Sequence, residues 1–293
     1  MFCKQRNRSS LLSVLIALML LLTNASAVAA SAKSEQSACD QAIHFEHDEF
    51  THPTKINNKW MSLVPGTQFI FDGFINQAGL PVAVPHQVVL TVTDLTKVIN
   101  GVQTVVLWDR DFDDGQLVEA ELAFFAQDNA GNVWNLGEYP EVYENGEFVG
   151  APDTWIAGLR RAQAGIHMLA KPRVGTDEYL QGWAPNIDFL DCATVFKKGQ
   201  TLCVPVTCYE NVLVTDETSP LDPESGHQRK YHAPGVGIIQ VGAVGDPEAE
   251  TLALVKRVRL SAHNLAEARE SALRLDRRAY RVSNVYRHTS PAE

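Results

Sequence analysis

Residues 103–125 read QTVVLWDRDFDDGQLVEAELAFF. Two apolar runs, 103–108 and 117–125, are separated by Asp113-Asp114-Gly115. An Asp-Gly pair tolerates positive φ angles, which the tight two-residue turns of β-hairpins require. The stretch therefore predicts two antiparallel strands joined by a tight turn.

The same pattern continues on both sides of this hairpin. Asn100-Gly101 precedes it and Asn145-Gly146 follows it, with short apolar runs between the turns. Successive hairpin signals without helical periodicity between them favour an antiparallel meander over a parallel α/β sheet. We therefore expect a mainly β protein, with a curved antiparallel meander, either half-barrel or sandwich, over residues 59–260. Further strands are predicted at 67–73, 87–93, 133–136, 188–196, 202–206, 211–216, 228–232, 237–241 and 252–260, with turns at Lys198-Gly199 and Pro234-Gly235.

Two segments lack this alternation of short apolar runs and turn signals. Residues 150–186 are punctuated by glycine and proline, and we expect an irregular insert with one short helix there. Residues 261–281 predict a helix, with Asn264 as N-cap and Glu267 completing a capping box. Its small apolar residues repeat at helical spacing, so this helix should pack closely on a flat surface such as a sheet. Residues 261–293 then form a basic C-terminal helix and tail.

The N-terminal segment predicts export. Lys4, Arg6 and Arg8 precede an apolar run at 11–22, and small residues follow near Ala30. This pattern is typical of a secretory signal peptide over residues 1–30, with an uncleaved anchor as the alternative. Residues 31–58 are polar and should form an extended lead-in. The expected location is periplasmic or secreted.

Charge limits the classes of partner. The chain has 25 Lys and Arg against 35 Asp and Glu, a net charge of −10. Such a field repels phosphate, so nucleic acid is excluded as a general partner. Residues 251–293 differ, because nine Lys or Arg there outnumber four acids. This basic segment either lies on the acidic body of the protein or contacts an anionic surface.

The cysteines predict a disulfide framework. Beyond the N-terminal segment the chain keeps Cys39, Cys192, Cys203 and Cys208, an even number in an exported protein. We prefer Cys203–Cys208, which flank a short strand connection, together with Cys39–Cys192. The other two pairings stay open. A four-cysteine zinc site is the competing interpretation, but the chain lacks CxxC pairs.

The lead-in holds a candidate metal site. His44, His47 and His52 lie within nine residues, interspersed with carboxylates. Imidazole and carboxylate groups suit zinc or copper, which are the candidate cofactors. The alternative is a solvated polar segment that happens to be rich in histidine.

Aromatic residues provide candidate ligand contacts. Trp155 and Trp183 lie in the irregular insert, and Trp134 lies on a predicted strand. We expect these three to face a ligand, although large aromatic side chains in β domains are more often core.

The acidic row Asp109, Asp111 and Asp113 has the period of a strand, so these side chains share one side of the hairpin. We expect a solvated face that discourages edge pairing, rather than a calcium loop. The sequence presents no nucleophile–base pair, and we assign no catalytic residue.

Three motifs carry a resemblance to known proteins. They are Asn57–Thr67 (NNKWMSLVPGT), Phe125–Glu138 (FAQDNAGNVWNLGE) and Tyr231–Gly237 (YHAPGVG). Together they resemble a group of exported bacterial β-rich proteins, matching over residues 50–245. The third motif also resembles the closing strands of periplasmic half-barrel proteins of the lipoprotein-carrier type. The resemblance implies an open, strongly curved antiparallel sheet and brings no catalytic residues.

These features predict an exported, non-catalytic binding protein that holds a small apolar or lipid-like ligand on its curved sheet. A secreted metal-dependent hydrolase is the first alternative. A structural module at the cell surface is the second.

Overall fold

A computed structural model describes residues 39, 44–77, 80 and 82–293. The expected signal peptide and most of residues 31–43 lie outside the described residues. The described helices include one long α-helix, α1 (Ala262–Val282). None of the helices in the described part of the chain is both long and apolar enough to cross a membrane.

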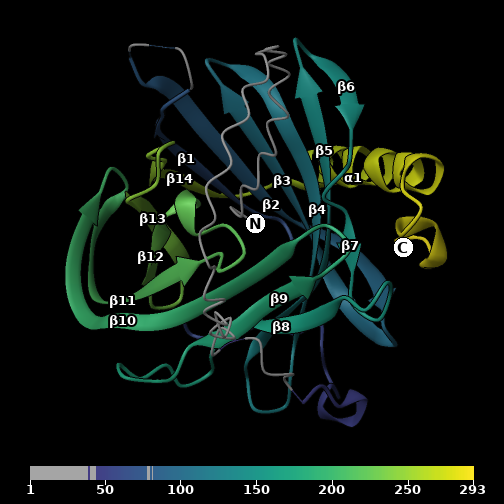
Figure 1. Ribbon diagram of the computed structural model, residues 1–293, viewed down its shortest axis with the longest axis horizontal. Helices are drawn as coiled ribbons and strands as arrows, with labels where there is room; N and C mark the ends of the chain where they lie inside the picture. Colours follow the sequence, from purple (N-terminus) through teal and green to yellow (C-terminus); the bar gives the residue numbers. More distant parts are fainter. Residues whose placement is uncertain (1–38, 40–43, 78–79, 81) are drawn as a thin grey trace, which may run out of the picture.

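The protein is mainly β, as predicted (Figure 1). Its strands are β1 (Thr67–Ile75), β2 (Val84–Ile99), β3 (Val102–Asp113), β4 (Gln116–Gln127), β5 (Val133–Glu144), β6 (Glu147–Gly150), β7 (Trp155–Ile156), β8 (Gln163–Met168), β9 (Tyr179–Ala184), β10 (Phe189–Val204), β11 (Thr207–Thr218), β12 (His227–Ala233), β13 (Gly237–Val244) and β14 (Thr251–Arg259). Short 3₁₀ turns are η2 (His47–Glu49), η3 (Pro223–Ser225) and η4 (Tyr286–His288).

The sheet closes into an antiparallel barrel, so the expected half-barrel or sandwich is wrong in this respect. β1 pairs with both β2 and β14, and β5 pairs with both β4 and β8. The ring therefore runs β4-β3-β2-β1-β14-β13-β12-β11-β10-β9-β8-β5 and returns to β4. Closure satisfies the backbone groups that an open sheet would leave at its edges.

The hairpin turns are built as the sequence predicts. Asn100, Asp114 and Asn145 have φ angles of 45°, 47° and 52°, and each is followed by a glycine with positive φ. A left-handed pair of this kind matches the twist of the flanking strands. These turns fix the register of β2–β3, β3–β4 and β5–β6.

Apolar residues form two layers on opposite faces of the barrel wall. Leu107 and Phe125 belong to an inner cluster with residues of β1, β2 and β11–β14. Their neighbours Val106 and Phe124 belong to an outer cluster, which includes Ala272 and other residues of α1. Val106 and Phe124 are thus buried on the outer face of the wall, where α1 packs against β2 and β4 (Figure 1).

The C-terminal helix packs on the sheet as expected, but its N-cap is different. Ser261 is the N-cap, and its side chain accepts a hydrogen bond from the backbone N–H of Asn264 at 3.2 Å. The observed N-cap thus lies three residues before the predicted N-cap, Asn264. The alanine-rich face, with Ala268, Ala272 and Ala279, is buried.

Two expectations about local structure are wrong. Residues 150–186 contain the strands β7, β8 and β9 in place of an irregular insert with a short helix. Lys198-Gly199 is no turn, because it lies within the continuous strand β10. The register of β10 against β11 shifts between Lys197 and Gln200, and Gly199 has φ 76°. The glycine thus marks an irregularity inside a strand.

Candidate functional site

Two loops at one end of the barrel border an open pocket. The first loop joins β11 to β12 and contains η3, and the second joins β13 to β14. The pocket has a volume of about 290 Å³. This lies near the lower end of the range for small-molecule sites.

Carboxylates dominate the lining of this pocket. Among the described residues that line it, no lysine or arginine occurs, and His227 is the one basic side chain. A lining of this composition favours a positively charged ligand. The carboxylate residues are Asp191, Glu217, Asp222, Glu224, Asp246, Glu248 and Glu250, hereafter the acidic pocket.

Gly226 lies where the two loops approach each other closely. It has φ 74°, and a Cβ placed there would lie 2.6 Å from the carbonyl carbon of Gly245. Only glycine combines this backbone conformation with such a close approach. The second loop is fixed further by Asp246, whose Oδ1 accepts a hydrogen bond from the Glu248 N–H at 2.8 Å.

The floor of the acidic pocket is a buried ion pair. Glu217 Oε2 lies 2.5 Å from Lys230 Nζ, and Thr215 Oγ1 donates to Glu217 Oε1 at 3.1 Å. Burial alone would raise the pKa of Glu217, but the ammonium group of Lys230 outweighs it and lowers this pKa to about 2. Glu217 therefore stays ionised at neutral pH. Lys230, being paired, is a counter-ion here and not a nucleophile.

A second buried ionic group adjoins the pocket at Glu250. The Gln228 side chain donates to Glu250 Oε2 at 2.6 Å, and His86 Nε2 lies 3.0 Å from Glu250 Oε1. Nδ1 of the same imidazole lies 2.6 Å from Asp113 Oδ1. Burial opposes charging of His86, yet the hydrogen bonds to both carboxylates raise its pKa to about 9. The imidazolium thus connects the pocket to the β2–β3 wall.

The acidic row of β3 lies inside the protein, so the expected solvated face is wrong. Asp109, Asp111 and Asp113 are 3%, 6% and 5% exposed. The period-two pattern is right, but these side chains share the inner face with Leu107. Burial and then the charge of Glu121 raise the pKa of Asp109 well above its usual range. The shift favours the neutral form of the Asp109 side chain over its carboxylate.

The predicted ligand-facing tryptophans do not line the acidic pocket. Trp155 and Trp134 are fully buried, and their indole N–H groups donate to Glu138 at 3.0 Å and Asp128 at 2.8 Å. Both belong to the outer apolar cluster. Trp183 is half-buried and packs against the cluster around Cys192. Trp134 and Trp155 are therefore core residues, as large aromatic side chains in β domains more often are.

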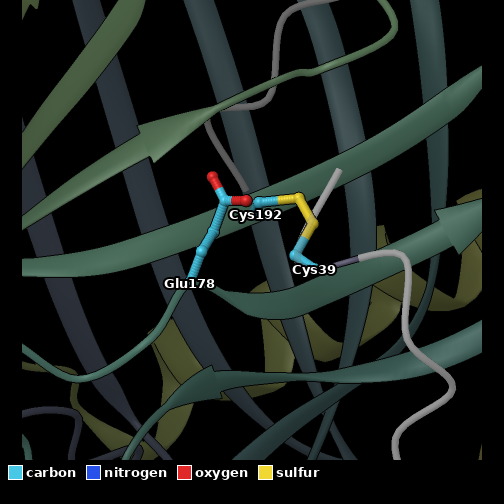
Figure 2. Close-up of side chains that lie close together, drawn as sticks. All are labelled: Cys39, Glu178 and Cys192. Atoms are coloured by element: carbon cyan, nitrogen blue, oxygen red, sulfur yellow. A yellow bond between two sulfur atoms is a disulfide. The ribbon is translucent and has the colours of Figure 1, made fainter. Parts of the chain in front are cut away.

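The lead-in histidines are not brought together as a metal site. His47 Nε2 lies 2.7 Å from the Asn100 carbonyl oxygen, and His44 Nδ1 lies 2.9 Å from Glu46. His52 is exposed. Among the described residues, Cys39, Glu178 and Cys192 are the one group whose potential ligand atoms converge within 4.8 Å. Figure 2 shows that these two cysteines are joined as a disulfide, so their sulfurs are not thiolate ligands.

Both preferred disulfides are present. Cys39 pairs with Cys192 at a Cα–Cα distance of 5.9 Å, and Cys203 pairs with Cys208 at 3.9 Å. The first joins residues 153 positions apart, and the second crosses the β10–β11 hairpin near its tip. Two disulfides fit the predicted extracytoplasmic location.

The basic helix contacts the body of the protein. Arg269 pairs with Asp94 of β2, and Arg278 Nη1 donates to Glu141 of β5 at 2.8 Å. These contacts support the intramolecular interpretation of the C-terminal charge. Contact with an anionic surface stays a prediction.

Most residues of the acidic pocket were not predicted. The acids at 222–224 and 246–250 fall in turn segments, where charged residues are ordinary. One sequence signal could have indicated the pocket: these acids are concentrated in the two loops that flank β12 and β13. That the loops meet depends on pairing of β11 with β12 and of β13 with β14, which sequence pattern alone does not give.

Comparison with known proteins gives only distant likenesses. No protein-family model matches the chain, and no curated protein matches it. One similar structure is described as an exported protein with a YmcC-like fold from Bacteroides fragilis NCTC 9343. Its sequence identity is 13% and its TM-score 0.36, and the match covers 72% of this chain and 99% of that chain.

A second similar structure is described as a lipoprotein from Parabacteroides distasonis ATCC 8503. Its identity is 12% and its TM-score 0.37, and the match covers 69% of this chain and 99% of that chain. Neither likeness is close enough to support an argument about ligand or partner.

Proposed function

We propose that this protein is an exported binding protein that holds a small organic cation with more than one amine group in the acidic pocket. The observation that carries the proposal is the composition of the pocket wall, which has seven carboxylates and no lysine or arginine among its described residues. Ammonium groups donate to several carboxylates at once, and the charges of ligand and pocket are complementary.

The spacing of the carboxylates favours an organic cation over a single metal ion. Within the described chain, no three pocket carboxylates bring ligand atoms within 4.8 Å of one another. A bound calcium ion needs six to eight oxygens at about 2.3–2.6 Å, which requires tight convergence. A diamine bridges separated carboxylates because its charges lie at opposite ends of a flexible chain.

An apolar or lipid-like ligand, the expectation from sequence, has weaker support. An apolar pocket lies between Phe71, Leu107 and Ile238, but its volume is about 30 Å³. That is space for about one water molecule. The larger pocket is lined mainly by polar groups, which favours a charged ligand.

Calorimetric titration with putrescine tests the proposal. The wild-type protein should bind it at one site, with affinity that falls as salt is raised. Replacing Asp222→Asn together with Glu224→Gln should weaken binding about tenfold or more, since each lost charge contact is worth about 1 kcal/mol. The control Glu144→Gln with Glu147→Gln removes the same charge from the exposed β5–β6 hairpin and should change nothing. Equal affinities in the two double variants would reject the acidic pocket as the site.

A further inference from the structure

Two polar side chains inside the barrel lack hydrogen-bond partners. His167 Nε2 and Tyr179 Oη are both buried, and neither makes a hydrogen bond to any described group. The His167 residue is only 5% exposed, and its ring lies 5.3 Å from the Phe125 ring of the inner cluster. Buried polar atoms are normally satisfied, so each of these two atoms is available to hydrogen-bond a bound group.

These groups lie beside the floor of the acidic pocket. Tyr179 of β9 and Glu217 of β11 both pair with Ala193 of β10, one from each side. They therefore belong to one cross-strand row on the inner face, separated by a residue whose side chain is a single methyl group. Gln228 of β12 continues the row opposite Glu217, and it also lines the acidic pocket.

The protonation states of His167 and Tyr179 determine which chemical group of a ligand they can bind. Burial lowers the pKa of His167 to about 3, and the carboxylate of Glu217 only partly opposes this. Burial, assisted by Glu217, raises the pKa of Tyr179. Both side chains are therefore neutral. Glu217 is already paired with Lys230, so a charged group placed here would be desolvated without a counter-ion of its own. A hydroxyl group, by contrast, can both donate and accept a hydrogen bond.

We propose that Tyr179 Oη and His167 Nε2 form a second subsite, which binds a hydroxyl group on the carbon chain of the amine held in the acidic pocket. This inference rests on the proposed function and narrows its ligand class to hydroxylated amines. The amine lies among the carboxylates at the mouth. The chain passes over Ala193, and its hydroxyl reaches the neutral pair.

Putrescine and hydroxyputrescine, which differ by one hydroxyl, test the subsite by calorimetry on the full chain. The wild type should bind hydroxyputrescine about tenfold more tightly, the factor expected for one or two net hydrogen bonds. Tyr179→Phe should abolish this difference and leave putrescine affinity unchanged. Tyr209→Phe, near the tip of the β10–β11 hairpin, is the matched control and should keep the difference.

The outcomes separate the two proposals. Equal binding of the two amines by the wild type, or an unchanged preference in Tyr179→Phe, would overturn the subsite and leave the acidic pocket standing. Binding of neither amine to the wild type would overturn both. Loss of putrescine affinity in Tyr179→Phe would also contradict the subsite, because the phenol would then act on the amine itself.

Discussion

His86 Nδ1 lies 2.6 Å from Asp113 Oδ1 inside the barrel. The opposite nitrogen of the ring lies 3.0 Å from Glu250, the residue before β14. One imidazolium therefore links the end of β3 to the loop that forms part of the acidic pocket. Gln77 adds a hydrogen bond to Asp113 Oδ2 at 2.9 Å. We regard this group as the connection between the barrel wall and the pocket.

The first prediction concerns pH. The pKa of His86 rises from 6.5 to about 9 on folding, so its stabilising effect is complete below pH 6.5 and is lost as pH rises through about 9. The free energy of unfolding should fall over this window by an amount on the order of 3 kcal/mol. Urea denaturation across the window measures this loss. His86→Gln should abolish the pH dependence, and a variant that retained the full loss would assign it to another group.

The second prediction concerns the buried lysine under the C-terminal helix. Lys97 Nζ lies 3.0 Å from Asp276 Oδ1 and donates to Tyr280 Oη at 2.8 Å and to the Ser290 carbonyl. Lys97→Met should lower the unfolding free energy by about 3–5 kcal/mol, because Asp276 would remain buried without its cation. Arg277→Met breaks the exposed pair with Glu270 and should cost less than about 1 kcal/mol. Similar losses of unfolding free energy in both variants would show that Lys97 is not the cation on which buried Asp276 depends.

The third prediction concerns the glycine between the pocket loops. Gly226→Ala adds backbone strain and a clash with the second loop, so it should cost about 2–4 kcal/mol and weaken putrescine binding. Gly146→Ala has the same positive φ, but no atom lies within 4 Å of the added methyl group. It should cost only about 1 kcal/mol and leave binding unchanged. Equal effects on binding would show that Gly226 does not shape the pocket.

The fourth prediction ranks the disulfides. The Cys39–Cys192 disulfide joins residues 153 positions apart, and Cys203–Cys208 joins residues 5 positions apart. The longer loop removes more conformational entropy from the unfolded chain when it is closed. On the chain-entropy model, Cys39→Ser with Cys192→Ser should cost about 5 kcal/mol, and Cys203→Ser with Cys208→Ser about 2 kcal/mol. Thermal and urea unfolding of the two double variants measure the order. The reverse order would contradict it.

Local features were predictable because they depend on neighbouring residues. Asn100-Gly101, Asp114-Gly115 and Asn145-Gly146 set their turns through their own backbone preferences, and the face of α1 follows from helical spacing. Lys198-Gly199 shows the limit of this approach. The same type of signal there marks an irregularity within β10, because pairing with β11 continues past it.

Closure of the barrel and the acidic pocket depend on distant residues. The β1–β14 pairing joins Thr67 to Arg259, and no local pattern specifies it. The row at Asp109 has a correct period, yet its inward direction follows from partners such as His86 on another strand. Assigning charged residues to the outer face fails when the interior of a barrel is itself polar.

A crystal structure of the protein soaked with putrescine would locate the ligand directly. We expect density for the diamine between the β11–β12 and β13–β14 loops, with its nitrogens within hydrogen-bonding distance of pocket carboxylates such as Asp222 and Glu248. A saturating soak that leaves this pocket without the diamine, or places it elsewhere on the barrel, would rule out the acidic pocket as the binding site.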